Sequence, residues 1–329
     1  MKSPLIYNTS LYSLTPSNCK LTKLGLINTR TKHKLVMAAE TVLVLGATGP
    51  LGICVIRELL HRNHCTIAYV RSPEKIPEAL KSNPLLEVSC LVHSAPGVFP
   101  PFPVPSPLDE PHSQPPTDRL TPPPPSSPYQ IATGAIESPL LAQTIASKAP
   151  TTIISLLGPT PASLANPFGA PLPYPAQYAE HILPAARAHG VRRILALCTL
   201  SHVTADDESS WTRAGLRGAV RALMPRAYQA MVGIAGVFEE EAGAGGLLEG
   251  VDWLLMRVPG LAGGSDDMGW RVDREIGGVY AGVVGGEWTA NVKRGRLAKW
   301  CVDWAEGEVT VGEGVGGKGR MPAVSAARG

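Results

Sequence analysis

Three glycines spaced three residues apart have the pattern of a phosphate-binding turn. Gly46, Gly49 and Gly52 follow directly after the apolar residues 42–45, and an amphipathic segment comes next. The first glycine permits a sharp turn off a strand, the second lets the backbone approach a pyrophosphate, and the third lets a helix pack closely. The N-terminus of that helix offers free N–H groups and a positive dipole end to an anion. The pattern predicts a dinucleotide-binding turn, with a purely structural glycine turn as the alternative.

Arg71 and Ser72 follow the second apolar run, residues 65–70. At this point of a dinucleotide-binding fold, an acidic residue hydrogen-bonds the ribose of NAD, whereas an arginine accommodates the extra phosphate of NADP. An arginine beside a serine hydroxyl therefore favours NADP (NADPH) as the cofactor. The alternative is a solvated arginine at the end of a strand.

Three later strand ends could complete a site, because ligands of a doubly wound sheet bind outside the carboxyl ends of its strands. The expected strands cover residues 151–156, 191–198 and 251–258. Leu157 and Gly158 should pass close to the ribose of the cofactor. Thr199 and Ser201 should lie beside the nicotinamide, unless they only cap the turn. Pro259 should close the pocket.

Strand and helix patterns alternate along the chain, as the positioning of these residues requires. They predict a Rossmann-like α/β fold, a doubly wound parallel sheet with helices on both faces and a small C-terminal region that covers the substrate. The further expected elements are helices over 73–82, 137–148, 178–189 and 294–306, and a strand over 85–92. Gly190 fits the C-cap of the third of these helices. All six tryptophans follow residue 210, so we expect them to form aromatic walls of the substrate site.

The domain organisation follows from changes in composition. We expect one NAD(P)-binding domain over residues 40–306 and a tail over residues 307–329. Residues 1–39 are basic and contain no acid, which suits a disordered extension or a transit peptide, and Met37 is an alternative start. The proline-rich residues 96–129 should form an extended surface insertion, with docking to an SH3-type partner as a less favoured role.

Composition excludes several classes of function. The net charge of +3 over 329 residues is too small to predict a nucleic-acid partner. No apolar run is long enough to cross a bilayer, so we expect no membrane partner. The six cysteines share no metal-type spacing, which suits a reducing compartment. We therefore expect a cytoplasmic protein, or a mitochondrial one if residues 1–36 are a transit peptide, that acts on a small molecule and binds no metal.

Five segments of the chain resemble one group of proteins. They are GATGPLG (46–52), YVRS (69–72), TTIISLLG (151–158), AARAHGVRRILALCTLS (185–201) and DWLLMRVPGL (252–261). With these segments the chain resembles atypical short-chain dehydrogenases/reductases of the NAD(P)H-binding, NmrA-like group, which includes biliverdin/flavin reductases. It is also similar to averufin-oxidase-type enzymes of polyketide pathways, which implies a role in secondary metabolism.

The resemblance implies a role for each matching residue. The diphosphate would be held by Gly46, Thr48, Gly49, Pro50, Leu51 and Gly52. Arg71 and Ser72 would hold the phosphate of NADP. Thr199 and Ser201 would line the nicotinamide pocket.

The usual proton donor of short-chain dehydrogenases is missing. That donor is a tyrosine with a lysine four residues on, but Tyr178 is followed by Ile182 and Tyr228 by Val232. Residues 218–246 contain no lysine either, and no Gly-Asp pair follows the third strand. Hydride transfer would then depend on binding geometry, with a proton from water, Ser201 or Tyr228. The candidate catalytic residues are Thr199, Ser201 and Tyr228.

Two functions remain open from the sequence. The first is an NADP-dependent oxidoreductase that acts on an aromatic or quinone-like small molecule. The second is a non-catalytic NADP-binding regulator that senses the redox state of its cofactor. An open cleft beside the two hydroxyls would favour the enzyme, and a pocket closed over the nicotinamide would favour the regulator.

Overall fold

The structure is a computed structural model that describes residues 11–14, 21–24, 40–90, 136, 139–285, 287–309, 311 and 320–328. The predictions for residues 96–129, and for most of residues 1–39, lie outside the described residues. Within the N-terminal stretch, β1 (Leu11–Leu14) pairs antiparallel with β2 (Leu21–Leu24).

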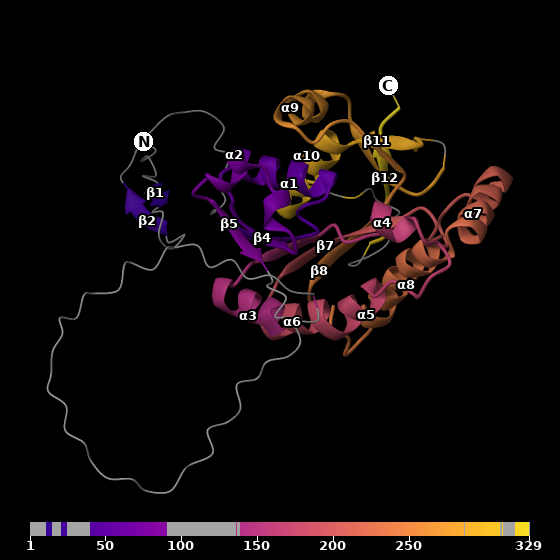
Figure 1. Cartoon of the computed structure of the whole chain (residues 1–329), viewed down its shortest axis with the longest axis horizontal. Helices are drawn as coiled ribbons and strands as arrows, with labels where there is room; N and C mark the ends of the chain where they lie inside the picture. Colours follow the sequence, from indigo (N-terminus) through magenta and orange to yellow (C-terminus); the bar gives the residue numbers. More distant parts are fainter. Residues whose placement is uncertain are drawn as a thin grey trace, which may run out of the picture.

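An eight-stranded sheet forms the centre of the molecule, in the order β10-β12-β8-β7-β6-β3-β4-β5 (Figure 1). Its strands are β3 (Thr41–Leu45), β4 (Cys65–Val70), β5 (Leu86–Cys90), β6 (Thr152–Ser155), β7 (Arg193–Thr199), β8 (Asp252–Val258), β10 (Val279–Gly282) and β12 (Ala323–Ala326). Every neighbouring pair is parallel except β10 and β12. The strand order reverses at β3, between β4 and β6. The predicted doubly wound sheet is therefore confirmed, and its switch point lies at the glycine turn.

Helices cover both faces of the sheet, because alternate residues of each strand face opposite sides. Val42 and Val44 pack in one core with α1 (Pro50–His61) and α10 (Arg294–Ala305), whereas Leu43 and Leu45 pack in the other. The second core contains apolar side chains of α3 (Pro139–Lys148), α6 (Leu183–Ala188) and α8 (Pro225–Glu241). Figure 1 shows the two groups of helices on opposite sides of the sheet.

The remaining elements are short or lie at the edges of the sheet. They are η1 (Pro73–Lys75), α2 (Glu78–Lys81), α4 (Pro161–Leu164), α5 (Tyr174–Gln177), η2 (Tyr178–Ile182), α7 (Trp211–Leu223), β9 (Gly260–Ala262), α9 (Asp267–Glu275) and β11 (Asn291–Lys293). β9 pairs with β11 in a separate two-stranded parallel sheet.

Two predicted helices differ from the structure near prolines. The segment 73–82 is interrupted at Ile76 and Pro77, both of which have extended backbones. A proline disfavours the helical conformation of the residue before it, which separates η1 from α2. The segment 178–189 begins as the π-helical η2 and continues as α6. Pro184 lacks the N–H that would bond in the first turn of α6, which suits the wider turn. Gly190 ends it with φ of +70°, as predicted.

The C-terminal residues do more than form a tail. Ala323–Ala326 is β12, which lies between β8 and β10, and Ala323, Val324 and Ser325 are buried. The boundary expected at residue 306 therefore does not separate the sheet from the rest of the chain. The four residues are small and lack the apolar alternation that predicts a strand.

Five of the six tryptophans lie in the cores or are exposed to solvent, so the expectation fails for all of them except Trp288, which lines a cavity described below. The four in the cores are Trp253, Trp270, Trp300 and Trp304. Trp211 is 94% exposed. Large aromatic side chains near the C-terminus stabilise helix packing here rather than build a ligand wall.

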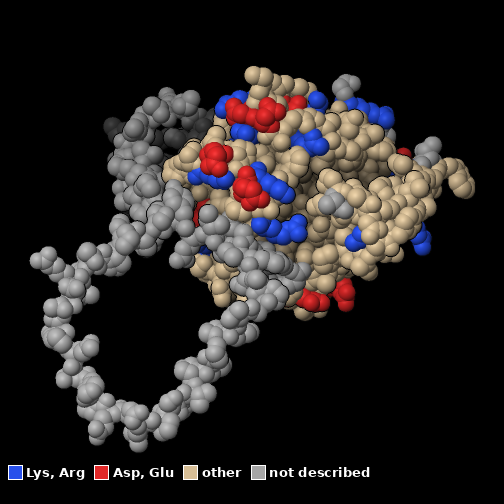
Figure 2. Space-filling model, viewed as in Figure 1, with Lys and Arg blue, Asp and Glu red and all other residues tan. Residues whose placement is uncertain are grey.

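Charged side chains link α1 to α9 and α10. Arg62 binds Glu58 (2.8 Å), Asp303 (2.6 Å) and Glu306 (2.6 Å), and Arg274 also binds the fully buried Glu58 at 2.9 Å. These arginines hold the pKa of Glu58 below its usual range against the opposing effect of burial. In Figure 2, acidic and basic side chains are interspersed on the face in view.

The structure describes the state of four cysteines and the apolarity of the helices. Cys54, Cys198 and Cys301 are free and buried, whereas Cys65 is disulfide-bonded, which the sequence did not predict. Among the helices of the described ranges, none has the length and apolarity to cross a membrane.

Candidate functional site

Packing explains two glycines of the turn. Gly46 has φ of +73°, and a Cβ there would lie 2.7 Å from the carbonyl oxygen of Leu156. A Cβ on Gly52 would lie 2.4 Å from the carbonyl oxygen of Gly46. Real Cβ atoms do not approach backbone this closely, so both positions require glycine for the contacts among β3, β6 and α1.

Gly49 has no such internal reason. Its φ is −71°, and a Cβ would meet only the carbonyl oxygen of Gly46, at 3.4 Å. The space beside this residue is open, and a ligand in contact with the Gly49 backbone would explain why the position is a glycine. Two of the three glycines therefore serve the fold, and Gly49 leaves a cradle that a side chain would fill.

The start of α1 suits an anion. No described side chain caps the helix, its first turn has no acidic residue, and Pro50 occupies the first position. Proline has no N–H, so the free donors are those of Leu51 and Gly52. Thr48 is half-buried in the turn before them. Backbone donors and the helix dipole together fit a pyrophosphate.

Arg71 emerges beside this turn. Leu45 pairs with Tyr69 across β3 and β4, which places the ends of both strands at one edge. Arg71 is exposed and has no carboxylate partner among the described residues. Burial raises the pKa of the Tyr174 phenol, and the positive charge of Arg71 opposes that rise, so the two side chains are near. Ser72, which precedes η1, is half-buried. A free guanidinium in this place can bind a phosphate.

Leu157 and Gly158 continue from β6 past the turn. The N atom of Leu157 would lie 3.2 Å from a Cβ on Gly46. Gly158 has room for a side chain, since its nearest neighbours would be Leu197 and Met231 at 3.8 and 3.9 Å. Proximity to the turn is therefore observed for Leu157, and sterics do not require a glycine at position 158.

A cavity of about 880 Å³ opens at the carboxyl ends of β6, β7 and β8. Its lining includes residues from those strand ends and from α7 and α8, which lie on the right in Figure 1. Most of the lining is apolar: Pro159, Leu164, Leu200, Leu216, Val220, Met224, Ala227, Met231, Val258, Val284, Trp288 and Ala290. Such a cavity has the size and character of a small-molecule site.

Four of the predicted site residues meet in this cavity. Thr199, Ser201, Tyr228 and Pro259 all line it. The Thr199 Oγ1 accepts a hydrogen bond from the Ser201 N–H at 3.3 Å, so the turn-capping alternative holds for Thr199. Its O–H remains a donor, because the cap uses the oxygen only as an acceptor. The Tyr228 ring lies 6.0 Å from the Arg221 guanidinium carbon. Gly46, Gly49 and Arg71 do not line the cavity; they lie at the neighbouring strand ends.

A buried ion cluster holds the cavity wall in place. Arg257 of β8 is 1% exposed, and Asp207 accepts hydrogen bonds from both of its terminal nitrogens, one of them at 2.9 Å. Asp207 also accepts from Arg213 at 2.8 Å and from the N–H of Val284 at 2.9 Å. The two guanidinium groups outweigh burial and hold the pKa of Asp207 well below its usual range. The Arg257 Nε donates to the Met321 carbonyl at 2.6 Å, which connects this wall to the C-terminal segment.

Sequence reasoning missed this cluster and the arginines of α7. Arg213 and Arg217 line the cavity, and their spacing of four residues places them on one helix face. The sequence shows this spacing, so it could have indicated that the two arginines lie side by side. The Asp207–Arg257 contact joins positions 50 residues apart, and no local pattern marks it. His202 lies outside the cavity lining, with its Nε2 3.2 Å from Glu239. Burial lowers its pKa, and its carbonyl accepts from Arg257.

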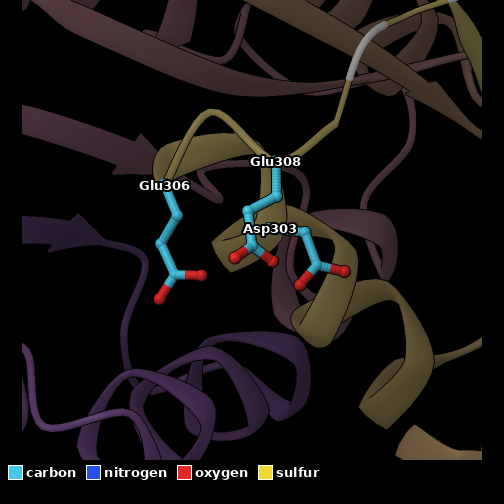
Figure 3. Close-up of side chains that lie close together, drawn as sticks. All are labelled: Asp303, Glu306 and Glu308. Carbon is cyan, nitrogen blue, oxygen red and sulfur yellow. The ribbon is translucent and has the colours of Figure 1, made fainter. Parts of the chain in front are cut away.

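An acidic cluster elsewhere does not form a second chemical site. Asp303, Glu306 and Glu308 have carboxylate oxygens within 4.8 Å of one another (Figure 3). Asp303 binds Arg62 and Lys299, and Glu306 binds Arg62 and His64. Because Arg62 already binds the carboxylates of Asp303 and Glu306, these two residues are part of the network between α1 and α10.

Comparisons with known proteins identify the fold. No family model matches the chain, and no curated protein matches it. Among solved structures, a proposed epimerase from Bacteroides thetaiotaomicron is 13% identical, with a TM-score of 0.53, over 88% of this chain and 99% of that one. The oxidoreductase ylbE from Lactococcus lactis is 12% identical, with a TM-score of 0.49, over 87% of this chain and 90% of that one. The enzyme WbmH from Bordetella bronchiseptica, solved with NAD+, is 13% identical, with a TM-score of 0.45, over 86% and 74%.

At these identities the likeness establishes the fold alone. The sheet order and the switch point define a Rossmann-like α/β fold. Activity has to be argued from this chain's own site.

Proposed function

We propose that the protein is an NADP-dependent oxidoreductase that acts on an aromatic or quinone-like small molecule. The observation that carries the proposal is the open cradle at Gly49, at a sheet edge shared with a large apolar cavity. A dinucleotide-binding turn at the switch point, with a cavity at the neighbouring strand ends, is the arrangement that such enzymes use. The proposal includes membership of the atypical short-chain dehydrogenase/reductase group, which the sequence resemblance supports.

The residues of the turn fit the cofactor. The N–H groups of Leu51 and Gly52 would hold the diphosphate, with Gly46, Thr48 and Pro50 shaping the loop. Arg71 and Ser72 would hold the ribose phosphate, and Leu157 and Gly158 would pass along the ribose. When bound, the nicotinamide supplies a hydride.

The cavity fits a flat apolar substrate. Its wall is largely apolar, and Trp288 and Tyr228 supply aromatic surface. The hydroxyls of Thr199 and Ser201 would hydrogen-bond a substrate carbonyl, and Pro259 would close the pocket beside them. A proton would come from Ser201, Tyr228 or water. The cavity is open, which favours turnover over a sealed sensor.

Cofactor titration and a substrate screen test the proposal. Wild-type protein should bind NADPH more tightly than NADH in isothermal titration calorimetry. It should then oxidise NADPH in the presence of at least one member of a panel of quinones and flavins. Ser201→Ala and Tyr228→Phe should lower that rate much more than they weaken NADPH binding, since both residues lie in the cavity and away from the turn that would hold the diphosphate. Absence of NADPH binding by folded protein would overturn the proposal.

A non-catalytic NADP-binding regulator is the second candidate. One observation favours it: the described cavity lining contains Tyr228 but neither lysine nor histidine to assist a proton transfer. On this reading, NADPH and NADP+ bind with different affinities, and no compound in the panel is reduced. Reduction of any of them above the background rate would exclude it.

A further inference from the structure

The α7 end of the cavity carries positive charge that the protein itself does not neutralise. Arg257 and Arg213 share the carboxylate of Asp207, so with Arg217 and Glu208 this end holds three arginines and two carboxylates, which leaves one positive charge in excess. Arg217 lies one turn further along α7, lines the same cavity, and has no carboxylate partner among the described residues. Glu208 is the acidic residue in the described lining. Its Oε1 lies 2.7 Å from where a Cβ on Gly285 would be, beside the loop after β10.

A buried donor at this end also lacks a partner. The Arg213 side chain is 12% exposed, and its Nη2 binds Asp207. Its Nε is buried and has no hydrogen-bond partner among the described residues. Leaving a charged donor buried and unpaired is costly, and a ligand bound in the cavity would give this donor a partner. The unpaired Nε and the free guanidinium of Arg217 point to the same kind of ligand group.

The rest of the wall decides what that group is attached to. The lining is mostly aliphatic and aromatic, with hydroxyls at the β7 end and arginines at the α7 end. An apolar body would fill the middle of the cavity, and a planar anion would pair with a guanidinium fork.

We infer that Arg217, supported by Arg213, binds a carboxylate, and that the substrate of this cavity is an apolar aromatic acid. The inference that this ligand is a substrate rests on the proposed function. Binding of the acid does not, because it requires no cofactor.

The test compares two ligands with the same bicyclic body. Isothermal titration calorimetry should show that wild-type protein binds 2-naphthoate about ten- to a hundred-fold more tightly than 2-naphthalenemethanol. Arg217→Leu should remove that preference and leave the affinity for the alcohol within about twofold. Arg217→Lys should keep part of the preference, because a point charge replaces the planar fork. Added salt should weaken binding of the acid and not of the alcohol.

Arg192→Leu is the matched control. Arg192 is an exposed arginine, whereas Arg217 is half-buried, and it precedes β7 at the opposite end of the sheet, so the preference for the acid should be unchanged. Arg213 is not substituted, because it holds Asp207. If Arg217→Leu fails to fold by circular dichroism, Arg217→Gln replaces it with the same expectation.

The possible outcomes separate this inference from the proposed function. Equal binding of the two ligands, no measurable binding of 2-naphthoate at millimolar concentration, or a preference retained in folded Arg217→Leu would overturn the inference. NADPH titration of the same samples tests the cofactor independently. An acid preference without NADPH binding would refute the oxidoreductase proposal and leave the carboxylate site standing.

Discussion

Gly49 differs from Gly46 and Gly52 because packing within the protein does not require a glycine at its position. We predict that Gly49→Val abolishes NADPH binding, because its side chain would fill the place of the pyrophosphate. The melting temperature should stay close to that of wild type, since the φ of −71° suits any residue and the nearest atom is 3.4 Å away. Calorimetric titration and thermal unfolding measure the two effects.

Gly52→Val is the contrasting variant. Its side chain would collide with the Gly46 carbonyl at 2.4 Å, so stability should fall first. Unchanged NADPH affinity in folded Gly49→Val would remove the site assignment.

Arg71 decides between the two nicotinamide cofactors. Its exposed guanidinium has no competing carboxylate in the described part of the chain. We predict that Arg71→Ala weakens NADPH binding about ten- to a hundred-fold, from the loss of charge-assisted hydrogen bonds worth roughly 1.5–3 kcal/mol each. NADH, which lacks the phosphate, should bind almost as before.

Two further measurements sharpen this prediction. Arg71→Lys should recover part of the preference for NADPH. Lys75→Ala, an exposed cation on η1, should change nothing. A wild-type protein that binds NADH as tightly as NADPH would show that Arg71 is ordinary surface.

Asp207 joins three segments of the cavity wall, because it accepts hydrogen bonds from Arg213, Arg257 and the N–H of Val284. Its side chain is 0% exposed and accepts hydrogen bonds from two arginines. We predict that Asp207→Asn costs about 3–5 kcal/mol in the free energy of unfolding, because two buried cations lose their carboxylate. Urea unfolding at neutral pH measures this loss.

The same residue gives the wild type a pH dependence with a definite sign. Folding lowers the pKa of Asp207 from its ordinary value of 3.8, so its stabilisation is fully present above that value. The stabilisation is lost as the pH falls from 3.8 toward the lower pKa of the folded state. In Asp207→Asn, the free energy of unfolding should lack this loss below pH 3.8. The same loss of stability with falling pH in both proteins would contradict the assignment.

At the scale of elements, a substitution in β12 tests whether this strand contributes to the stability of the sheet. Val324 is 0% exposed and packs in the core that contains α1 and α10. We predict that Val324→Asp destabilises the fold by about 3 kcal/mol or more, because it buries an unpaired charge. Arg328→Asp, two residues past β12 and exposed, should leave the melting temperature unchanged. Equal melting temperatures for the two variants would mean that β12 does not contribute to the sheet.

Elements with strong local patterns were predictable, and weak ones were not. β3, α1 and β4 follow from an apolar run, a glycine turn and a second apolar run. The interruption at Ile76 could have been read from Pro77, since a residue before proline avoids the helical region. β12 could not, because its four small residues gain their strand conformation from β8 and β10.

At the scale of the whole molecule, topology was easier to predict than the site it creates. Parallel strands share one carboxyl edge, and Thr199, Ser201 and Pro259, which lie at or just after the ends of β7 and β8, line one cavity there. The arginines of the cavity depend on contacts between distant segments, such as Arg257 with Asp207, which no local spacing encodes. The tryptophan prediction failed for all but Trp288, because large aromatic side chains can serve packing as well as binding.

One whole-molecule prediction concerns residues outside the described ranges. The composition of residues 96–129 predicts an extended surface segment, and limited proteolysis should cut there before it cuts the sheet. Edman sequencing or mass spectrometry of the first fragments locates the cut. First cleavage inside residues 139–285 would contradict the prediction.

The position of β12 has a consequence for the order in which the protein is made. During synthesis, β8 leaves the ribosome well before β12, which must later lie against it. Until then, one hydrogen-bonding edge of β8 is open, and the Arg257 Nε lacks the Met321 carbonyl as its acceptor. An unpaired strand edge is a template for pairing with another chain. Until β12 has been made, the nascent protein therefore exposes a strand edge of the kind that favours aggregation.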